Sequence, residues 1–437
     1  MKELVRSAWQ WLADSRLARC VADTLFRGKA RRRIVELDHQ SVARSQNRTL
    51  LGLVNKAHKT RFGREHDFRR IRDVNDFRRL VPLCTPSQLW REYWQPAYPN
   101  MAGATWPGPI PYLAISASAK NGEFPCIPVS PELWATQQTA ALTALAFVMH
   151  ARPQTRLCSG QLFLLGGGTT LVPPPSLLQA DSMEAIALRE LPTTLQPYAF
   201  ASPSLDSRTG GLIEDRYLQQ LAVRSLTMPV TCLAGTADRL AKFFTHVKQA
   251  SGRDSISDIW PRLSSVLYTR GANEPDRARL LDDVSNRAVL CLEMYFRPEG
   301  AIAIEDPRHG GLRLLPDHGV YFEFVPVDQI GKARPARYSA HEVKVGVPYA
   351  VALSSPAGVW ACLVGSVVKF EKTDPPLFRL VESGTIWEQL SPKTEELPKS
   401  TSLPRPHIRV LQSAVEARMR TPRVHLSLGA SFPNRDF

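Results

Sequence analysis

The hydrophobic and polar positions along this chain of 437 residues follow two spacings, one helical and one typical of strands. Short apolar runs that fit buried strands recur, and amphipathic stretches separate several of them. We expect strands at 161–165, 230–233, 265–268, 289–294, 319–325, 349–353 and 367–370, and helices at 34–60, 74–80, 130–150, 237–250 and 275–284. This alternation predicts an α/β fold with substantial parallel pairing.

The clearest helix start lies at Ser130. It is followed by Pro131 and Glu132, which is the pattern of a serine N-cap, a proline in the first turn and an early acidic residue. The helix at 74–80 should end before Pro82, because proline drives the residue before it out of the α region.

Proline content and charge divide the chain into three predicted parts. Residues 1–45 form a basic amphipathic helical segment, and residues 46–382 form one large domain that is long enough to bury a sizeable core. Residues 383–437 are basic and rich in proline, which is typical of a tail rather than of a second domain.

The net charge of +14 is partly concentrated at the N-terminus, where residues 1–33 hold nine Lys or Arg and three acidic residues. Apolar residues at helical spacing accompany them: Val5, Trp9, Leu12, Val21 and Leu25. This segment either contacts an anionic membrane surface or another protein, or it docks its apolar stripe on its own domain. We favour docking. No pattern typical of nucleic-acid binding is present.

The seven cysteines are scattered singly without a Cys-x-x-Cys pair, so we predict neither a zinc site nor a disulfide framework. A reducing compartment fits this usage. The longest mostly apolar run, 140–149, is shorter than the roughly 20 residues that span a bilayer, and no leader pattern is recognised. We therefore expect a cytoplasmic protein, with peripheral membrane contact as the open alternative.

Generic catalytic motifs are missing from the sequence, including the nucleophile elbow, the dinucleotide fingerprint and the Walker loop. Several short sequence segments are more informative about the protein family, because of their order and spacing along the chain. They are 59–63, 77–82, 126–130, 259–263, 293–295, 299–300, 321–326, 354–355, 357–360 and 364–365.

Together these segments, between Leu51 and Phe378, resemble the auxin-responsive acyl-acid amido synthetases of the acyl-adenylate-forming superfamily. The resemblance implies a large N-terminal domain of layered sheets with a small distorted β-barrel. The small C-terminal domain of that fold has no recognisable counterpart after Val381, so we predict that it is missing or degenerate.

The resemblance also implies a reaction. In this family a small carboxylic acid attacks the α-phosphorus of ATP, and an amine or amino acid then displaces AMP to form an amide. ATP and Mg²⁺ would be the cofactors of an active enzyme, and a noncatalytic protein would need none.

The resemblance assigns roles to several residues. Tyr295 would stack on adenine, Glu299 would act in catalysis and serve Mg²⁺ and phosphate, and Ser366 stands where relatives bind ribose with an aspartate. Ser118 and Lys120 belong to the phosphate-binding loop. From the residues alone, Tyr295 could equally be a packed aromatic and Glu299 a surface acid, and this alternative stays open.

The candidate nucleotide site departs from the family pattern in several places. Phe124 and Pro125 replace the basic residue of the phosphate loop, and proline removes a backbone donor. Arg297 interrupts a run of small and hydroxyl residues, and residues 361–363 replace an Arg-Tyr-Arg run. Ser366 in place of aspartate costs about 1.5–3 kcal/mol of ribose binding.

Two hypotheses follow. The one we favour is a noncatalytic binding protein whose ATP site is impaired or lost. The alternative is an active ligase with a rebuilt phosphate site that uses Lys120, Arg270 and Arg297. Both rest on the expectation that residues 116–125 and 361–366 line one cavity.

Overall fold

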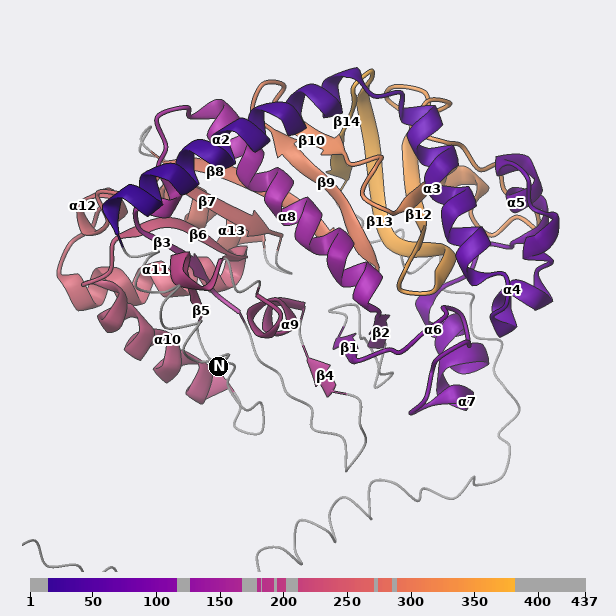
Figure 1. The fold of residues 1–437 in the computed structure, drawn as a ribbon, viewed down its shortest axis with the longest axis horizontal. Helices are drawn as coiled ribbons and strands as arrows, with labels where there is room; N and C mark the ends of the chain where they lie inside the picture. The colour runs from indigo at the N-terminus through magenta and orange to yellow at the C-terminus, as the bar shows by residue number, and fades with distance from the viewer. Residues whose placement is uncertain are drawn as a thin grey trace, which may run out of the picture. The chain divides into compact units, whose positions relative to one another are not determined.

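The computed structural model describes residues 15–115, 126–166, 179–181, 183–191, 195–201, 211–270, 274–284 and 289–381. These residues belong to the first of two compact units, Met1–Ser391, which is drawn in Figure 1. The predicted tail lies outside the described residues, so its structure and the domain boundaries remain predictions.

The longer helices of the described residues are α2 (Arg16–His39), α3 (Val42–Ala57), α4 (Arg61–Glu65), α5 (Val74–Leu80), α8 (Pro131–Ala151), α9 (Met183–Arg189), α10 (Gly211–Ser225), α11 (Ala237–Ser251) and α13 (Glu274–Asp283). Short helical turns are α6 (Pro86–Leu89), η2 (Trp90–Trp94), α7 (Gln95–Ala97) and α12 (Ile256–Ile259). The 3₁₀ turns are η1 (Phe68–Arg70), η3 (Leu157–Ser159), η4 (Gln196–Tyr198) and η6 (Val327–Gln329).

The strands are β1 (Tyr112–Ile115), β2 (Cys126–Val129), β3 (Gln161–Leu164), β4 (Gln179–Asp181), β5 (Ala199–Ala201), β6 (Val230–Thr236), β7 (Ser265–Thr269), β8 (Leu290–Arg297), β9 (Gly300–Asp306), β10 (Gly311–Leu314), β11 (Tyr321–Pro326), β12 (Pro348–Ser355), β13 (Val359–Thr373) and β14 (Pro376–Val381). Each strand predicted from the sequence lies within or overlaps one of these.

The larger sheet joins a parallel half to an antiparallel half. Its order is β5-β3-β6-β7-β8-β9-β10-β14-β13-β12-β11, and the pairs from β5 to β8 are parallel. Strand β8 belongs to both halves, because residues 290–293 pair with β7 and residues 294–297 pair with β9. The smaller sheet has the order β2-β1-β4. The predicted α/β fold with parallel pairing is confirmed.

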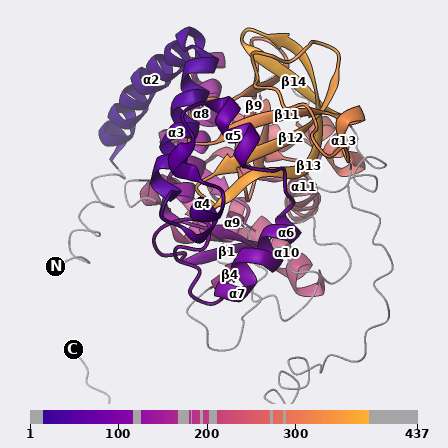
Figure 2. The ribbon, with the colours of Figure 1, turned by 90° about the vertical axis from the view of Figure 1, so that its right-hand side faces the viewer.

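Helices cover both faces of the parallel half. Neighbouring residues of a strand point to opposite faces of the sheet, and here both faces carry apolar side chains that the helices bury. Leu233 and Val266 pack in one hydrophobic cluster with α11, whereas Cys232 and Leu267 pack in another with Phe147 of α8. Figure 2 shows α2 and α8 on one side of the strands and α11 and α13 on the other.

The predicted start of α8 is confirmed in detail. The Ser130 hydroxyl accepts a hydrogen bond from the Leu133 amide at 3.0 Å and donates one to the Pro356 carbonyl at 2.7 Å. The same residue therefore caps the helix and ties its first turn to the loop after β12.

The single helix predicted over 34–60 is wrong. The chain breaks at Gln40, whose backbone is extended, and Ser41 starts a new helix by accepting from the Arg44 amide at 3.4 Å. A serine N-cap competes with helix continuation, because its side chain satisfies an amide that has no partner in the first turn.

Helix α2 packs on its own domain, but not through the predicted apolar stripe, because Val21 and Leu25 are exposed and the stripe's other residues lie outside the described ones. Ala30, Ile34 and Leu37 are buried in the cluster that contains Phe147, and Figure 1 shows α2 running along α8. Among the described helices, none is both long and apolar enough to cross a bilayer.

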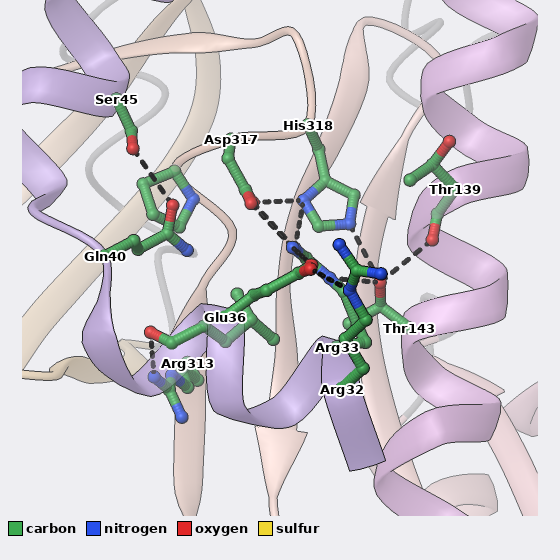
Figure 3. A network of polar contacts seen from close by, with 12 residues as sticks. Arg32, Arg33, Glu36, Gln40, Ser45, Thr139, Thr143, Arg313, Asp317 and His318 are labelled. Atoms are coloured by element: carbon green, nitrogen blue, oxygen red, sulfur yellow. Dashed lines mark hydrogen bonds and ion pairs between the residues drawn. The ribbon is translucent and has the colours of Figure 1, made fainter. Parts of the chain in front are cut away.

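Polar contacts fix α2 at its middle. Arg33 donates to both carboxylate oxygens of Asp317 at 2.6 and 2.7 Å and to the Thr143 hydroxyl of α8 at 3.3 Å. Thr143 also contacts the buried His318 ring at 3.0 Å, as Figure 3 shows. Burial raises the pKa of Asp317, but the hydrogen bonds from His318 and Arg33 outweigh it and lower the pKa overall.

The C-terminal end of α2 is held by a buried charge network. Arg313, which is 2 % exposed, donates to Asp38 at 2.6 Å, to Asp306 at 3.1 Å and to the Leu37 carbonyl at 2.6 Å. Burial raises the pKa of Asp38, but hydrogen bonds from Arg308 and Arg313 lower it to about 2. A carboxylate that holds the buried arginine therefore stays ionised in neutral solution.

We predict that Arg313→Ala lowers the free energy of unfolding by about 2–3 kcal/mol, because it removes the donor to the Leu37 carbonyl and one of the two arginines that pair with the buried Asp306; Arg308 continues to pair with that carboxylate. Urea unfolding followed by circular dichroism measures this loss. The matched control is Arg32→Ala, which removes an ion pair with Glu36 on the exposed side of α2 and should cost about 0.5 kcal/mol or less. Equal effects of the two substitutions would contradict the structural role of the network.

Candidate functional site

The turn between β8 and β9 carries Arg297 and Glu299, two charged residues of the candidate nucleotide site. Arg297 pairs with Gly300 across the hairpin, so Pro298 and Glu299 form its tip. A Cβ atom on Gly300 would lie 2.9 Å from the Val320 side chain, which explains why glycine follows the acid.

Side chains from two other elements fix this turn. Gln137 of α8 donates to the Arg297 carbonyl at 2.8 Å, and Ser355 of β12 donates to the Glu299 carbonyl at 2.5 Å. The turn backbone is thereby locked from the helix layer and from the antiparallel half of the sheet. A rigid turn of this kind can hold a functional side chain in one place.

Glu299 is fully buried, so it is not the surface turn acid of the open alternative. One carboxylate oxygen, Oε2, lies 3.4 Å from the Arg297 Nε atom. The other, Oε1, is buried and has no hydrogen-bond partner among the described residues. A buried carboxylate with one open oxygen is rare, because an unmade hydrogen bond to a charged group is costly.

Tyr295 is 7 % exposed and packs in the hydrophobic cluster beneath the antiparallel strands. Burial raises the pKa of its hydroxyl, whereas the Arg297 charge and a contact with the Ser366 hydroxyl lower it. The charges of Glu299 and Arg270 also act on this hydroxyl. The structure therefore brings together Tyr295, Arg297, Glu299 and Ser366, which the sequence assigned to one site.

Arg270 directly follows β7, and its charge acts on the Tyr295 hydroxyl. It forms an ion pair with Glu293. Its Nε atom donates to Glu293 Oε1 at 2.6 Å, and its Nη2 atom donates to Glu293 Oε2 at 3.3 Å. Glu293 is 4 % exposed, and its backbone amide donates to Glu305 Oε2 at 2.9 Å. Sequence reasoning missed the pair, because Glu293 was seen only as part of a family segment.

Ser118 and Lys120 lie outside the described residues, in the segment 116–125 between β1 and β2. The strands that flank the segment pair antiparallel, with Ile115 opposite Cys126. The hydrophobic cluster that contains Tyr295 also includes residues 126, 127, 361, 362 and 364. The expected cavity shared by 116–125 and 361–366 remains a prediction.

Residues 361–363, where the resemblance implies an Arg-Tyr-Arg run, are buried and uncharged. Ala361 has a positive φ of 45°, which is uncommon for a residue other than glycine. Its amide donates to the Ser354 hydroxyl at 2.8 Å, and its carbonyl accepts from the Cys84 amide at 3.2 Å. These two bonds hold a strained backbone at the point where β13 passes the candidate site.

Comparison with known proteins assigns the family. The GH3 family N-terminal domain matches residues 31–203, and the GH3 family central domain matches residues 313–382, which together make up more than half of the chain. The chain belongs to the GH3 family. This confirms the resemblance to acyl-acid amido synthetases of the acyl-adenylate-forming superfamily.

Solved structures similar to this GH3 protein support its fold. AtGH3.15 acyl acid amido synthetase in complex with 2,4-DB has a TM-score of 0.63 at 14% identity, and the match covers 81% of this chain and 70% of that one. A 2-hydroxyisobutyryl-CoA ligase with 2-HIB-AMP and CoA has a TM-score of 0.51 at 13% identity, covering 79% and 68%. No curated protein sequence matches the chain.

We predict that Arg297 and Glu299 are energetically coupled. Arg297→Ala should lower the free energy of unfolding by about 3 kcal/mol, because it leaves the Glu299 carboxylate buried and unpaired. In the double variant with Glu299→Gln, most of this loss should disappear, giving a coupling of about 1–3 kcal/mol in a double-mutant cycle.

Urea unfolding of the four proteins measures the coupling. Arg379→Ala is the control, since it breaks an ion pair of 2.6 Å with Glu371 that is largely exposed and should change stability by about 0.5 kcal/mol or less. If the losses of unfolding free energy in the two single variants simply added up in the double variant, the predicted coupling between Arg297 and Glu299 would be wrong.

Proposed function

We propose that this GH3 protein is a noncatalytic binding protein for a small carboxylic acid, and that its adenylation site is impaired. The ion pair between Arg297 and Glu299 carries this proposal. In the family resemblance, Glu299 is the residue that serves Mg²⁺ and phosphate, yet here its carboxylate already has a cation beside it.

A magnesium ion at Glu299 would be placed next to the Arg297 guanidinium. Two positive charges of +2 and +1 that are about 4 Å apart repel each other by roughly 8 kcal/mol at an effective dielectric constant of 20. Among the described residues, no group of three or more His, Cys, Asp or Glu gathers to offset this repulsion. Magnesium at this position would therefore need negative charge from outside the described residues, such as nucleotide phosphates.

The arginines of the alternative hypothesis are also neutralised by protein groups. Arg270 donates to both oxygens of the buried Glu293, and Arg297 faces Glu299. To hold phosphate instead, each would have to leave a buried carboxylate without its partner, which costs about 3–5 kcal/mol. This cost argues against a rebuilt phosphate site made from Arg270 and Arg297.

The same cluster keeps one feature that suits a carboxylate. The Tyr295 hydroxyl is a buried donor with no well-formed hydrogen bond among the described residues. A phenol hydroxyl can donate a hydrogen bond to a carboxylate oxygen. The similar AtGH3.15 protein is described as an acyl acid amido synthetase, so a small organic acid is the ligand class that we propose.

Absence of adenylation is the first prediction of this proposal. Purified protein incubated with ATP, Mg²⁺ and a panel of aryl and short-chain carboxylic acids should give no acid-dependent ATP–pyrophosphate exchange. Exchange that is lost in Glu299→Ala would overturn the proposal and support the active ligase.

Binding without metal is the second prediction. Members of the same acid panel should raise the thermal midpoint equally with Mg²⁺ and with a chelator, and the shift should disappear in Tyr295→Phe, which lacks only the hydroxyl. Arg379→Ala, which lies away from the cluster, should keep the shift. Stabilisation by nucleotide that requires Mg²⁺ and is lost in Glu299→Ala would contradict the proposal.

A further inference from the structure

Two cysteines that are 278 positions apart in the sequence lie directly opposite each other in the fold. Cys84 lies in the segment between α5 and α6, and Cys362 lies in β13. They form an isolated parallel β-bridge, in which the Cys84 amide donates to the Ala361 carbonyl at 3.2 Å and the Leu363 amide donates to the Cys84 carbonyl at 2.9 Å.

This bridge is possible because one edge of β13 is open at that point. Strand β12 pairs with Cys362 through Leu353, whereas β14 pairs with β13 only from Val367 onward. The segment that carries Cys84 fills the edge that β14 leaves uncovered. Both cysteines are free thiols in the structure.

We propose that Cys84 and Cys362 are a site of reversible oxidation, where a small disulfide converts the two thiols to an intramolecular disulfide. Residues opposite each other in a bridge point to the same face of the sheet, and neighbouring strands lie about 4.8 Å apart, which falls within the 4.4–6.8 Å range of Cα separations in disulfides. The Cys84 thiol is also close enough to Cys362 to raise the pKa of its thiol.

The two thiols differ in accessibility, which orders the reaction. Cys84 is half-buried, and its thiol donates to the Trp360 carbonyl at 3.1 Å. Cys362 is fully buried. An external disulfide therefore reaches Cys84 first, and Cys362 acts as the resolving thiol.

The exchange balances in two steps. The deprotonated Cys84 sulfur attacks the external disulfide RSSR, so that a mixed disulfide forms and one RS⁻ leaves and takes up a proton. The Cys362 thiolate then attacks the Cys84 sulfur, which forms the protein disulfide and releases a second RSH. Two protein thiols lose two electrons in total, and RSSR gains them.

Burial and the neighbouring Cys84 raise the pKa of Cys362 well above its ordinary value. A raised thiol pKa means that little thiolate exists near neutral pH, so the second step is slow there. Its rate should increase about tenfold per pH unit while the pH stays below that pKa. The mixed disulfide is therefore the species that accumulates at neutral pH.

The proposed disulfide would form next to the candidate functional site. The charges of Glu299 and Arg297 act on the Cys362 thiol, so the new bond would form beside the ion pair of the candidate site. It would also tie the segment before α6 to the strained residue Ala361. The oxidation itself does not depend on the proposed function, because it requires only the two thiols and an oxidant.

Oxidised glutathione tests the proposal on the folded full-length protein at pH 7 and pH 9. At pH 9 a non-reduced digest of the wild type should contain one peptide pair joined through Cys84 and Cys362, whereas at pH 7 the glutathione adduct on Cys84 should predominate. Cys362→Ala should accumulate the glutathione adduct on Cys84 at both pH values, and Cys84→Ser should form neither species at position 362. Cys20→Ser, which removes an exposed cysteine on α2, should lose only the adduct at position 20 and keep the products at Cys84 and Cys362.

A second measurement keeps the proposal testable if one variant folds poorly. Oxidised wild-type protein should unfold several degrees higher than reduced protein, because the bond closes a long loop in the unfolded chain. Dithiothreitol should reverse the shift. A wild-type digest with no bond between Cys84 and Cys362 at pH 9, a disulfide that joins other cysteines, or a Cys362→Ala protein without an adduct on Cys84 would each overturn the proposal.

Discussion

Burial of the Glu299 carboxylate is the constraint on which the candidate site depends. The acid lies at the tip of the hairpin where the large sheet changes from parallel to antiparallel pairing, and ligands of α/β proteins often bind where strand order changes. A buried charge needs a partner, and here the partner is Arg297 from the same turn. This choice of partner is the observation that supports our proposal of an impaired adenylation site.

The same rule governs the other buried charges. Arg313 meets Asp306, Arg270 meets Glu293, and each pair is nearly closed to solvent on at least one side. Such pairs add little net stability compared with apolar residues, but removal of one member is costly. They therefore keep α2 and the end of β7 in fixed positions. Glu299 differs, because one of its oxygens is left without a partner among the described residues.

Family membership and site chemistry lead to different conclusions about activity. The two matching domains and the similar solved structures agree on an acyl-adenylate-forming fold. Function depends on the groups placed on that fold. In this chain Ala361, Cys362 and Leu363 stand where the resemblance implies an Arg-Tyr-Arg run, and Ser366 stands where it implies a ribose-binding aspartate. These replacements are the reason that we propose a binding role rather than adenylation.

Local signals in the sequence were sufficient for elements whose boundaries depend on neighbouring residues. Ser130 and Pro131 determine the start of α8, and Pro82 lies just beyond the end of α5, because caps and prolines act within a few residues. The break at Gln40 also had a local signal in Ser41, but the long helical pattern around it concealed the cap. The alternation of apolar and polar residues located most of the strands, because this pattern also depends only on neighbouring residues.

Tertiary structure alone decided which distant residues meet. Nothing in the spacing of Arg270 and Glu293, or of Cys84 and Cys362, predicts that they touch, because strand order and register bring them together. The sequence by itself determined the family, the layered fold and the identity of the residues at the β8–β9 turn. Only the folded chain decided that Glu299 is buried and paired, because burial depends on what α8, β12 and β13 place around it.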